Sequence, residues 1–201
     1  MTTNDRVDHG VLVRLLLLYG AYNLIHNFVF LLAYHLFPPG FLKGTHVMAI
    51  ASWVGSAGGL WGVFGRTLLM NLGVMGTICV LLNLQRVRTI PLGYTVPLFL
   101  GVTTGLALGT NSFAGIDLSN IPFRAGTAEG LSIGGAEMLG YMCLIAATSR
   151  ISMYQRQTWW RWSEYFVRIR RISDLRLSLS EIVVLVAGIG LIVLGAYRET
   201  W

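Results

Sequence analysis

The feature that most constrains this chain is the series of long apolar runs that follow one another from Val11 to Tyr197. Each run extends for about 18 residues or more, which is the length a helix needs to cross the hydrocarbon core of a bilayer. Charged residues make up only 12% of the 201-residue chain, whereas ordinary soluble domains contain about 25%. The pattern predicts an all-α fold, a polytopic membrane helical bundle in which residues 1–201 form one domain.

Six membrane segments are predicted from the apolar runs and from the residues that interrupt them. The first segment ends at Pro38-Pro39-Gly40, because proline lacks an amide donor and disfavours helix in the residue before it. The second is rich in glycine, so it either packs tightly or is re-entrant, turning back without crossing. The predicted segments cover residues 11–37, 47–64, 67–83, 93–115, 128–149 and 177–197.

Segments 93–115 and 128–149 form a predicted helical hairpin, and each arm carries a small residue at every fourth position. Residues with this spacing lie on one strip of a helix and let two backbones approach closely, which is a main source of helix association in lipid. We expect these strips to pack helices within the chain and against partner membrane proteins. They consist of Gly101, Gly105 and Gly109 in the first arm and of Ala128, Ser132, Ala136 and Gly140 in the second.

Residues 150–176 differ from the rest of the chain because they combine arginine and tryptophan. The helical spacing of the aromatic residues predicts an amphipathic helix that lies in the membrane interface. We expect its basic and aromatic side chains to contact anionic lipid headgroups or a partner's acidic surface, and the plain alternative is a solvated face. The residues concerned are Trp159, Trp160, Arg161, Trp162, Arg168, Arg170 and Arg171.

The basic residues also predict an orientation. The net charge is +6, and the positive-inside rule places the basic segment 150–176 in the cytoplasm. With six crossings, both termini then lie outside. Because the basic cluster is flanked by apolar segments, a membrane surface is a better partner for it than nucleic acid. The expected location is a cell membrane, the inner membrane of a bacterium.

Glu137 lies near the middle of a predicted membrane segment. A carboxyl group is costly there, so its presence is by default a functional hypothesis. In one interpretation it accepts a hydrogen bond from Thr103, Thr104 or Tyr141 and locks helices together. In the other it carries a proton or a cation in a polar cavity. Asn71 is a further polar group that could line a path for a transported ion or solute.

The first segment carries a polar strip formed by Tyr19, Asn23, His26 and Asn27. Interhelical hydrogen bonding is the plain interpretation of such a strip. The alternative is that His26 or His35 ligates a haem or a chlorophyll-type pigment, because one neutral imidazole on a membrane helix suffices for that. The two histidines face nearly opposite directions, which argues against a shared metal site. No cofactor is otherwise predicted.

The sequence contains no H-E-x-x-H motif, P-loop or dinucleotide-binding fingerprint, so it does not predict an enzyme. The first hypothesis is a non-catalytic membrane scaffold or accessory subunit that packs against other integral membrane proteins or against itself. The second is a small ion or solute transporter or channel that uses Glu137. The third is a pigment- or haem-binding subunit of an energy-transducing complex.

Residues from about Gly62 to Met153 resemble the stage II sporulation protein M family of small polytopic membrane proteins. The matching features are Asn71 in an apolar helix, the three glycines that lead to Asn111, and Gly134-Gly135-Ala136-Glu137 followed by Ala146-Ala147. The resemblance implies an all-helical membrane protein that acts with partners in machinery that remodels membrane and wall.

Overall fold

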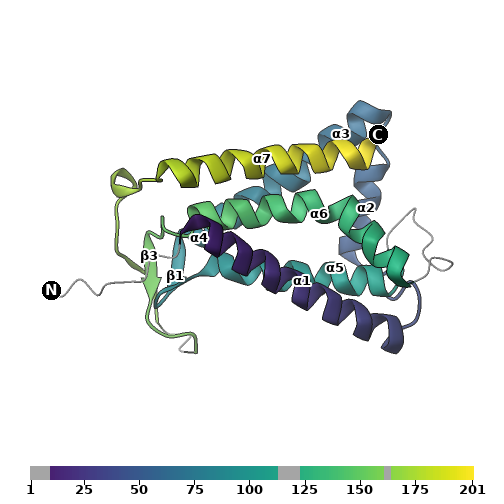
Figure 1. The fold of residues 1–201 in the computed structure, drawn as a ribbon, viewed down its shortest axis with the longest axis horizontal. Helices are drawn as coiled ribbons and strands as arrows, with labels where there is room; N and C mark the ends of the chain where they lie inside the picture. The colour runs from purple at the N-terminus through teal and green to yellow at the C-terminus, as the bar shows by residue number, and fades with distance from the viewer. Residues whose placement is uncertain (1–9, 113–122, 161–163) are drawn as a thin grey trace.

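The computed structural model describes residues 10–112, 123–160 and 164–201, with side chains for all of these except Val47 and residues 123–134. The described chain is mostly helical, which confirms the all-α prediction. The long helices lie side by side along one axis, and a small sheet covers one end of the bundle (Figure 1).

Four helical stretches are long and apolar enough to cross a membrane. They are α1 (Val11–Leu36), the continuous helix formed by α3 (Leu60–Leu68), the π-helix η1 (Leu69–Gly76) and α4 (Thr77–Asn83), the helix formed by η2 (Leu92–Thr95) and α5 (Val96–Gly109), and α7 (Leu179–Thr200). A fifth long helix, α6 (Phe123–Thr148), contains the shorter apolar stretch Gly135–Thr148. α6 runs along the bundle beside these four stretches, so the described chain makes five long passes along it.

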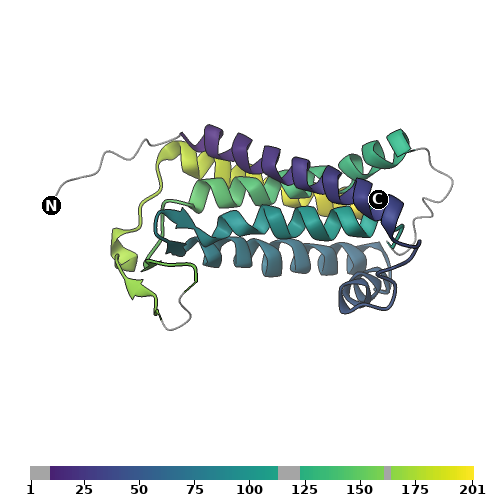
Figure 2. The same ribbon diagram turned by 90° about the horizontal axis from the view of Figure 1, so that it is seen from below.

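Successive long helices run in opposite directions along the bundle (Figures 1 and 2). The start of α1 lies at the end that carries the sheet, and we call this the sheet end (Figure 1). Trp201 lies at the opposite end, which we call the far end (Figure 1). The start of α1 and the end of α7 thus lie at opposite ends of the bundle, whereas the sequence predicts both termini on one side of the membrane.

The predicted membrane segment 47–64 is not one helix. α2 (His46–Gly55) has 10 residues, and α3 begins only at Leu60, after a turn in which Gly59 has φ +83°. Glycine adopts this left-handed conformation readily, so it breaks the helix here. A helix of this length spans about 15 Å and cannot cross a bilayer. The predicted second segment is therefore not a single crossing helix, and the described chain makes five long passes along the bundle.

The predicted interfacial helix over residues 150–176 is also wrong. A four-stranded sheet with the order β2-β1-β3-β4 takes its place. Its strands are β1 (Gln85–Val87), β2 (Ile90–Pro91), β3 (Tyr154–Arg156) and β4 (Val167–Arg168), and the short 3-10 helix η3 (Ile172–Asp174) follows. β1 pairs in parallel with β3, so Arg86 lies opposite Gln155. This backbone partner from a distant segment outweighs the helical spacing of the side chains.

The two strips of small residues do not pack against each other. α5 lies along α1, where a Cβ atom added at Gly105 would be 2.6 Å from the carbonyl oxygen of His26. α6 lies along α7, where a Cβ atom at Gly140 would be 2.8 Å from the carbonyl oxygen of Gly188. The glycines thus provide the predicted close packing. The predicted hairpin is wrong in its pairing, because each arm packs against a different helix (Figure 2).

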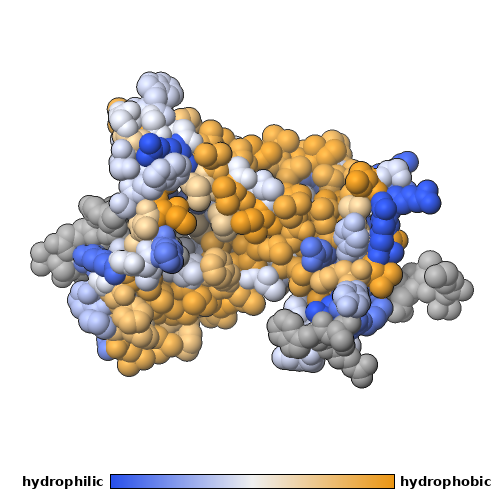
Figure 3. Space-filling view, turned by 180° about the vertical axis from the view of Figure 1, so that it is seen from behind, coloured by the Kyte–Doolittle hydropathy of each residue, from blue (hydrophilic) through white to orange (hydrophobic). Residues whose placement is uncertain are grey.

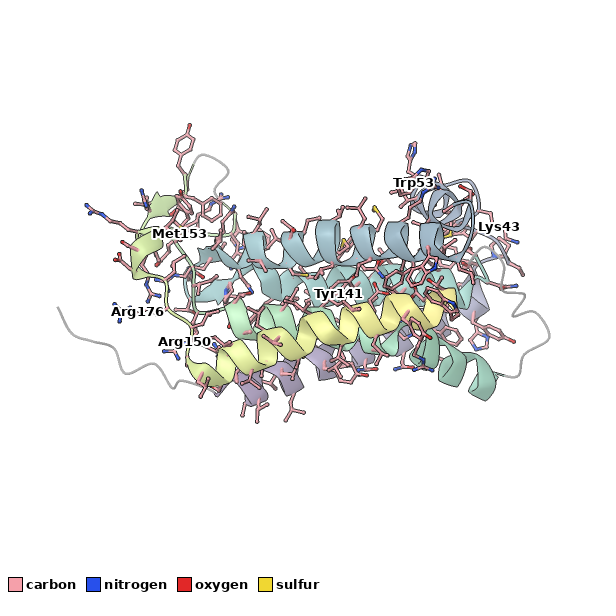
Figure 4. All side chains as sticks on the ribbon, turned by 90° about the horizontal axis from the view of Figure 1, so that it is seen from above. Lys43, Trp53, Tyr141, Arg150, Met153 and Arg176 are labelled. Atoms are coloured by element: carbon pink, nitrogen blue, oxygen red, sulfur yellow. The ribbon has the colours of Figure 1, made fainter. Side chains whose placement is uncertain are left out.

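The core is centred on the second half of α6, where residues 141–147 are all buried. They contact α7, α1 and the helix that contains α4, and Figure 4 shows Tyr141 in the middle of the bundle. On the face shown in Figure 3, the surface along the middle of the bundle is largely apolar, whereas hydrophilic residues gather towards its two ends. This distribution matches the environment of a membrane and its two interfaces.

Candidate functional sites in the bundle and at the sheet end

Glu137 lies on the face of α6 that packs against α7, and it is 7% exposed. The hydroxyl of Tyr141, one turn further along the same helix, donates a hydrogen bond to its Oε1 atom at 2.5 Å. Among the three hydroxyls predicted as partners, Tyr141 is the one in contact, whereas Thr103 donates to carbonyl oxygens of its own helix. The bond orients the Glu137 carboxyl but does not itself join two helices.

A second carboxyl group, from Glu199, lies within hydrogen-bonding distance of the Glu137 carboxyl. Glu199 belongs to the last turn of α7 and is exposed. One turn earlier, Gly195 leaves room, since a Cβ atom there would be 3.1 Å from the Glu137 Cβ. Gly195 lies five residues before Thr200, so this contact is about 7.5 Å along the helix from the end of α7. Glu199, in the last turn of α7, links the site to the exposed end of that helix.

His26 and Thr104 connect α1 to α5. The Nδ1 atom of His26 lies 2.9 Å from the Thr104 hydroxyl, and the Tyr22 hydroxyl lies 3.4 Å from the same oxygen. His26 is buried, with its ring 5.6 Å from that of Tyr22. These contacts confirm interhelical hydrogen bonding for part of the polar strip. They leave Nε2 as the His26 atom that could ligate a pigment or haem.

The other polar residues of the first segment lie elsewhere. Asn23 and Asn27 donate hydrogen bonds to backbone carbonyls one turn earlier in α1, so these two hydrogen bonds lie within a single helix. His35 is exposed, with its ring edge-on to Tyr34. Asn71 is half-buried in the π-helix η1. Within the described chain, no group of three or more His, Cys, Asp or Glu residues is placed to hold a metal ion.

A buried ion pair that the sequence analysis missed joins α1 to α7 at the sheet end. The Arg14 guanidinium donates to Glu181 Oε1 at 2.7 Å and to the Ser149 hydroxyl at 3.0 Å, so three helices meet here. Glu181 is 2% exposed. Its Oε2 accepts hydrogen bonds from the backbone amide and hydroxyl of Ser178, which cap the start of α7. The signal in the sequence is the Ser178-x-x-Glu181 capping box.

The small residues of the second strip fall into two groups. Gly140 contacts α7 as described, and Ala136 is half-buried. Ala128 and Ser132 belong to the backbone of α6, but their side chains lie outside the described residues. Gly188 of α7 was not predicted, although it approaches α6 as closely as Gly140 approaches α7, because the sequence does not show which glycine of an apolar run meets another helix.

The predicted lipid or partner surface belongs to the sheet end. Trp159 is 41% exposed and Trp160 is 87% exposed, while Arg161 and Trp162 lie outside the described residues. Directly before Trp159 in the sequence, Gln157 and Thr158 contact Glu164, whose carboxylate accepts hydrogen bonds from the hydroxyl and amide of Thr158 and from the amide of Gln157. The Thr158 hydroxyl, these amides and nearby Arg156 hold the pKa of Glu164 below its usual value.

A shallow groove opens at the sheet end between β4 and η3, and we call it the arginine groove. Its volume is about 460 Å³, and its lining residues are Arg168, Ile169, Arg170, Arg171 and Asp174. The predicted residues Arg168, Arg170 and Arg171 therefore line one groove, although they belong to β4 and the residues after it and not to the predicted helix. The groove is open and polar, so it suits a charged ligand better than an apolar one.

Comparison with known proteins supplies no relative: no protein-family model, no curated protein and no solved structure matches this chain. The resemblance to the stage II sporulation protein M family therefore rests on the residues between about Gly62 and Met153.

Proposed function

We propose that this protein is a non-catalytic integral membrane scaffold or accessory subunit whose sheet end faces the cytoplasm. The observation that carries the proposal is the separation of basic residues along the bundle. Nine described arginines lie at the sheet end, namely Arg14, Arg86, Arg88, Arg150, Arg156, Arg168, Arg170, Arg171 and Arg176. The basic residues at the far end are Lys43, Arg66, Arg198 and, at the start of α6, Arg124, whose side chain lies outside the described residues. The positive-inside rule therefore favours a cytoplasmic sheet end.

Aromatic residues at both ends support this placement across a bilayer. At the far end, Trp61 and Trp201 lie with their rings 5.1 Å apart, and both are partly exposed. At the sheet end, Trp160 and Tyr165 are strongly exposed. Tryptophan and tyrosine are enriched where a membrane protein meets the two interfaces. Between these levels α7 has 22 residues, which corresponds to about 33 Å of helix and matches the thickness of a bilayer core.

Partner contact at the sheet end fits the structure better than contact through the glycine strips. The described strip glycines pack against α1 or α7 of the same chain, so they are not open to another protein. The sheet end instead presents exposed aromatic and basic side chains together, of which Figure 4 labels Arg150 and Arg176. Tryptophan and arginine are enriched in protein interfaces. An acidic partner, or a second copy through its acidic residues, fits such a surface.

A gentle purification tests the scaffold role. We expect the tagged protein to bring down membrane partners in stoichiometric amounts, as measured by mass spectrometry. Reversing the charge of the sheet end with Arg88→Glu and Arg176→Glu should release them, whereas Arg198→Glu at the far end is the matched control. Recovery of a monodisperse monomer with no partner, under conditions that keep other membrane complexes intact, contradicts the proposal.

A second function, transport of a proton or a small cation, is favoured by the contact between Glu137 and Glu199. Two carboxyl groups that touch each other hold a proton or a cation between them, because two bare carboxylates repel. One of the pair is buried and the other reaches the surface. Tyr141 continues the polar chain from Glu137 towards the core.

Reconstituted liposomes test this second function. Glu137→Gln and Glu199→Gln should each abolish a cation- or proton-dependent flux, measured with an internal pH dye. The glutamine carbonyl at position 137 still accepts the Tyr141 hydrogen bond, so the fold should persist. Glu164→Gln, at the sheet end, removes a carboxylate outside the bundle and serves as the control. Equal flux in all variants and in empty liposomes excludes transport.

A further inference from the structure

We infer that the arginine groove binds the phosphate of an anionic glycerophospholipid headgroup. The inference rests on the proposed placement of the sheet end at the membrane surface and names the ligand that this surface takes. Arg168, Arg170 and Arg171 line the groove and are exposed, and Asp174 is the acidic residue among its lining residues. Guanidinium groups bind phosphate oxygens in pairs of parallel hydrogen bonds, so three around one groove form a suitable site.

The charges of the groove are available to a ligand. Within the described chain, none of its three guanidinium groups forms an ion pair. Asp174 is engaged locally, since its Oδ2 accepts the Arg171 amide at 3.0 Å and its Oδ1 accepts the Ser173 hydroxyl at 3.1 Å. Its carboxylate therefore caps η3 and does not neutralise the arginines by direct contact.

The groove is also held in place by the bundle. Arg170 Nη1 donates to the carbonyl oxygen of Arg150 at 2.9 Å, and Arg168 Nε donates to that of Arg170 at 3.1 Å. The amide of Ile169 donates to the carbonyl oxygen of Met153 at 2.8 Å. These bonds connect the groove to the residues that follow α6. Because the lining residues are already held in place, ligand binding costs less conformational entropy.

A lipid fits better than a free anion because apolar side chains flank the arginines. Val167 is 65% exposed, Ile169 is 38% exposed and Ile172 is 71% exposed. In the sequence, Val167 and Ile169 flank Arg168 and Ile172 follows Arg171, and Ile169 also lines the groove. Alternating apolar and basic exposed residues suit the boundary between acyl chains and headgroups, where burial of apolar area adds to electrostatic attraction.

Native mass spectrometry of the full chain in neutral detergent tests the site without depending on orientation. The probes are phosphatidylglycerol, phosphatidylcholine of the same acyl chains, and inorganic phosphate as a competitor. We expect selective retention of phosphatidylglycerol, and about tenfold weaker retention in Arg168→Gln with Arg171→Gln, as the loss of charge-assisted hydrogen bonds predicts. The matched control, Arg66→Gln with Arg198→Gln, removes the same charge at the far end and should retain the lipid.

Three results overturn the inference. Equal loss in both double variants shows general charge attraction, equal retention of phosphatidylcholine shows binding through acyl chains, and competition by equimolar inorganic phosphate shows a free-anion site. If Arg168→Gln with Arg171→Gln unfolds, Arg168→Lys with Arg171→Lys keeps the charge and should still weaken retention, because lysine lacks the guanidinium fork. Full retention by the lysine variant contradicts a shaped site. Each result leaves the recovery of partners, the test of the proposed function, unaffected.

Discussion

The α1–α5 and α6–α7 pairs show two ways of joining helices in one bundle. Both pairs rely on glycine for a close backbone approach, at Gly105 in the first and at Gly140 with Gly188 in the second. The α1–α5 contact otherwise uses neutral groups such as His26 and Thr104. The α6–α7 pair carries buried carboxyl groups near both of its ends. Close packing therefore does not require a buried charge, so the carboxyl groups need a separate explanation.

The two buried carboxyl groups of the α6–α7 pair have different surroundings. Glu181 forms an ion pair with Arg14 and accepts hydrogen bonds from Ser178, so its negative charge is balanced within the structure. Glu137 contacts Tyr141 and another carboxyl group, Glu199, and within the described chain it has no basic partner. The first arrangement suits a structural lock, and the second suits a site that exchanges a proton or a cation.

The largest expected effect is the loss of one partner of the lock. Arg14→Met leaves the Glu181 carboxylate without its closest cation, which should lower the free energy of unfolding by about 3 kcal/mol or more. Arg14→Met with Glu181→Met removes both charges and should cost less than the sum of the single changes. Unfolding in mixed detergent measures both. Additive losses would show that the two side chains do not form a pair.

Glycine substitutions compare the two helix pairs directly. A methyl group at Gly105 or at Gly140 would collide with a neighbouring helix, so Gly105→Ala and Gly140→Ala should each destabilise the bundle by about 1–3 kcal/mol. Gly20→Ala in α1 and Gly190→Ala in α7 place the same methyl in open space. These controls should be neutral or slightly stabilising. Equal unfolding free energies for the buried and open positions would contradict the described pairing of helices.

A smaller effect tests the neutral hydrogen bond of the α1–α5 pair. Thr104→Val removes the hydroxyl that contacts His26 and Tyr22, and an interhelical hydrogen bond of this kind contributes about 0.6 kcal/mol in a membrane protein. Thr103→Val is the matched control, because the Thr103 hydroxyl donates only to carbonyl oxygens of α5 in the described structure. In the same assay, Thr104→Val should have a lower free energy of unfolding than Thr103→Val. Equal values would show that the Thr104 contact does not stabilise the bundle.

The smallest effect concerns Glu164, an acidic residue outside the bundle. Its lowered pKa means that the folded state favours the carboxylate. The stabilisation is therefore present above the ordinary glutamate pKa of about 4.3 and is lost as the pH falls through the lowered value. The test is hydrogen exchange of the Gln157 and Thr158 amides, with each rate divided by the rate expected for an unstructured peptide at the same pH. The protection of both amides should fall at acid pH. Glu164→Gln should abolish this dependence, and its persistence would assign it to another group.

Long helices could be predicted from the sequence because their signal is local. The predicted segment 11–37 matches α1, and 177–197 overlaps most of α7, since uninterrupted apolar runs and Pro38 define them. Local spacing failed in residues 150–176, where Arg86 and Gln155 pair across distant parts of the chain. Strand pairing of that kind depends on a partner segment that no local pattern specifies.

The candidate site was predictable only in part. Glu137 could be identified because a carboxyl group inside an apolar run is unusual. Its contact with Glu199, and that of Arg14 with Glu181, depend on how the helices align once they pack. Each of these partners lies near the end of a helix, where charged residues are ordinary. Their positions in the sequence therefore did not identify these residues as members of a site.

The central claim is that five passes separate the sheet end from the far end across a membrane. Cysteine labelling in intact cells tests it most directly, because the native Cys79 and Cys143 are buried. Lys43→Cys at the far end should react with a membrane-impermeant maleimide from outside. Ser173→Cys, on the exposed η3, should react only after the membrane is permeabilised. Labelling of both positions from the same side, as six crossings would require, contradicts the account.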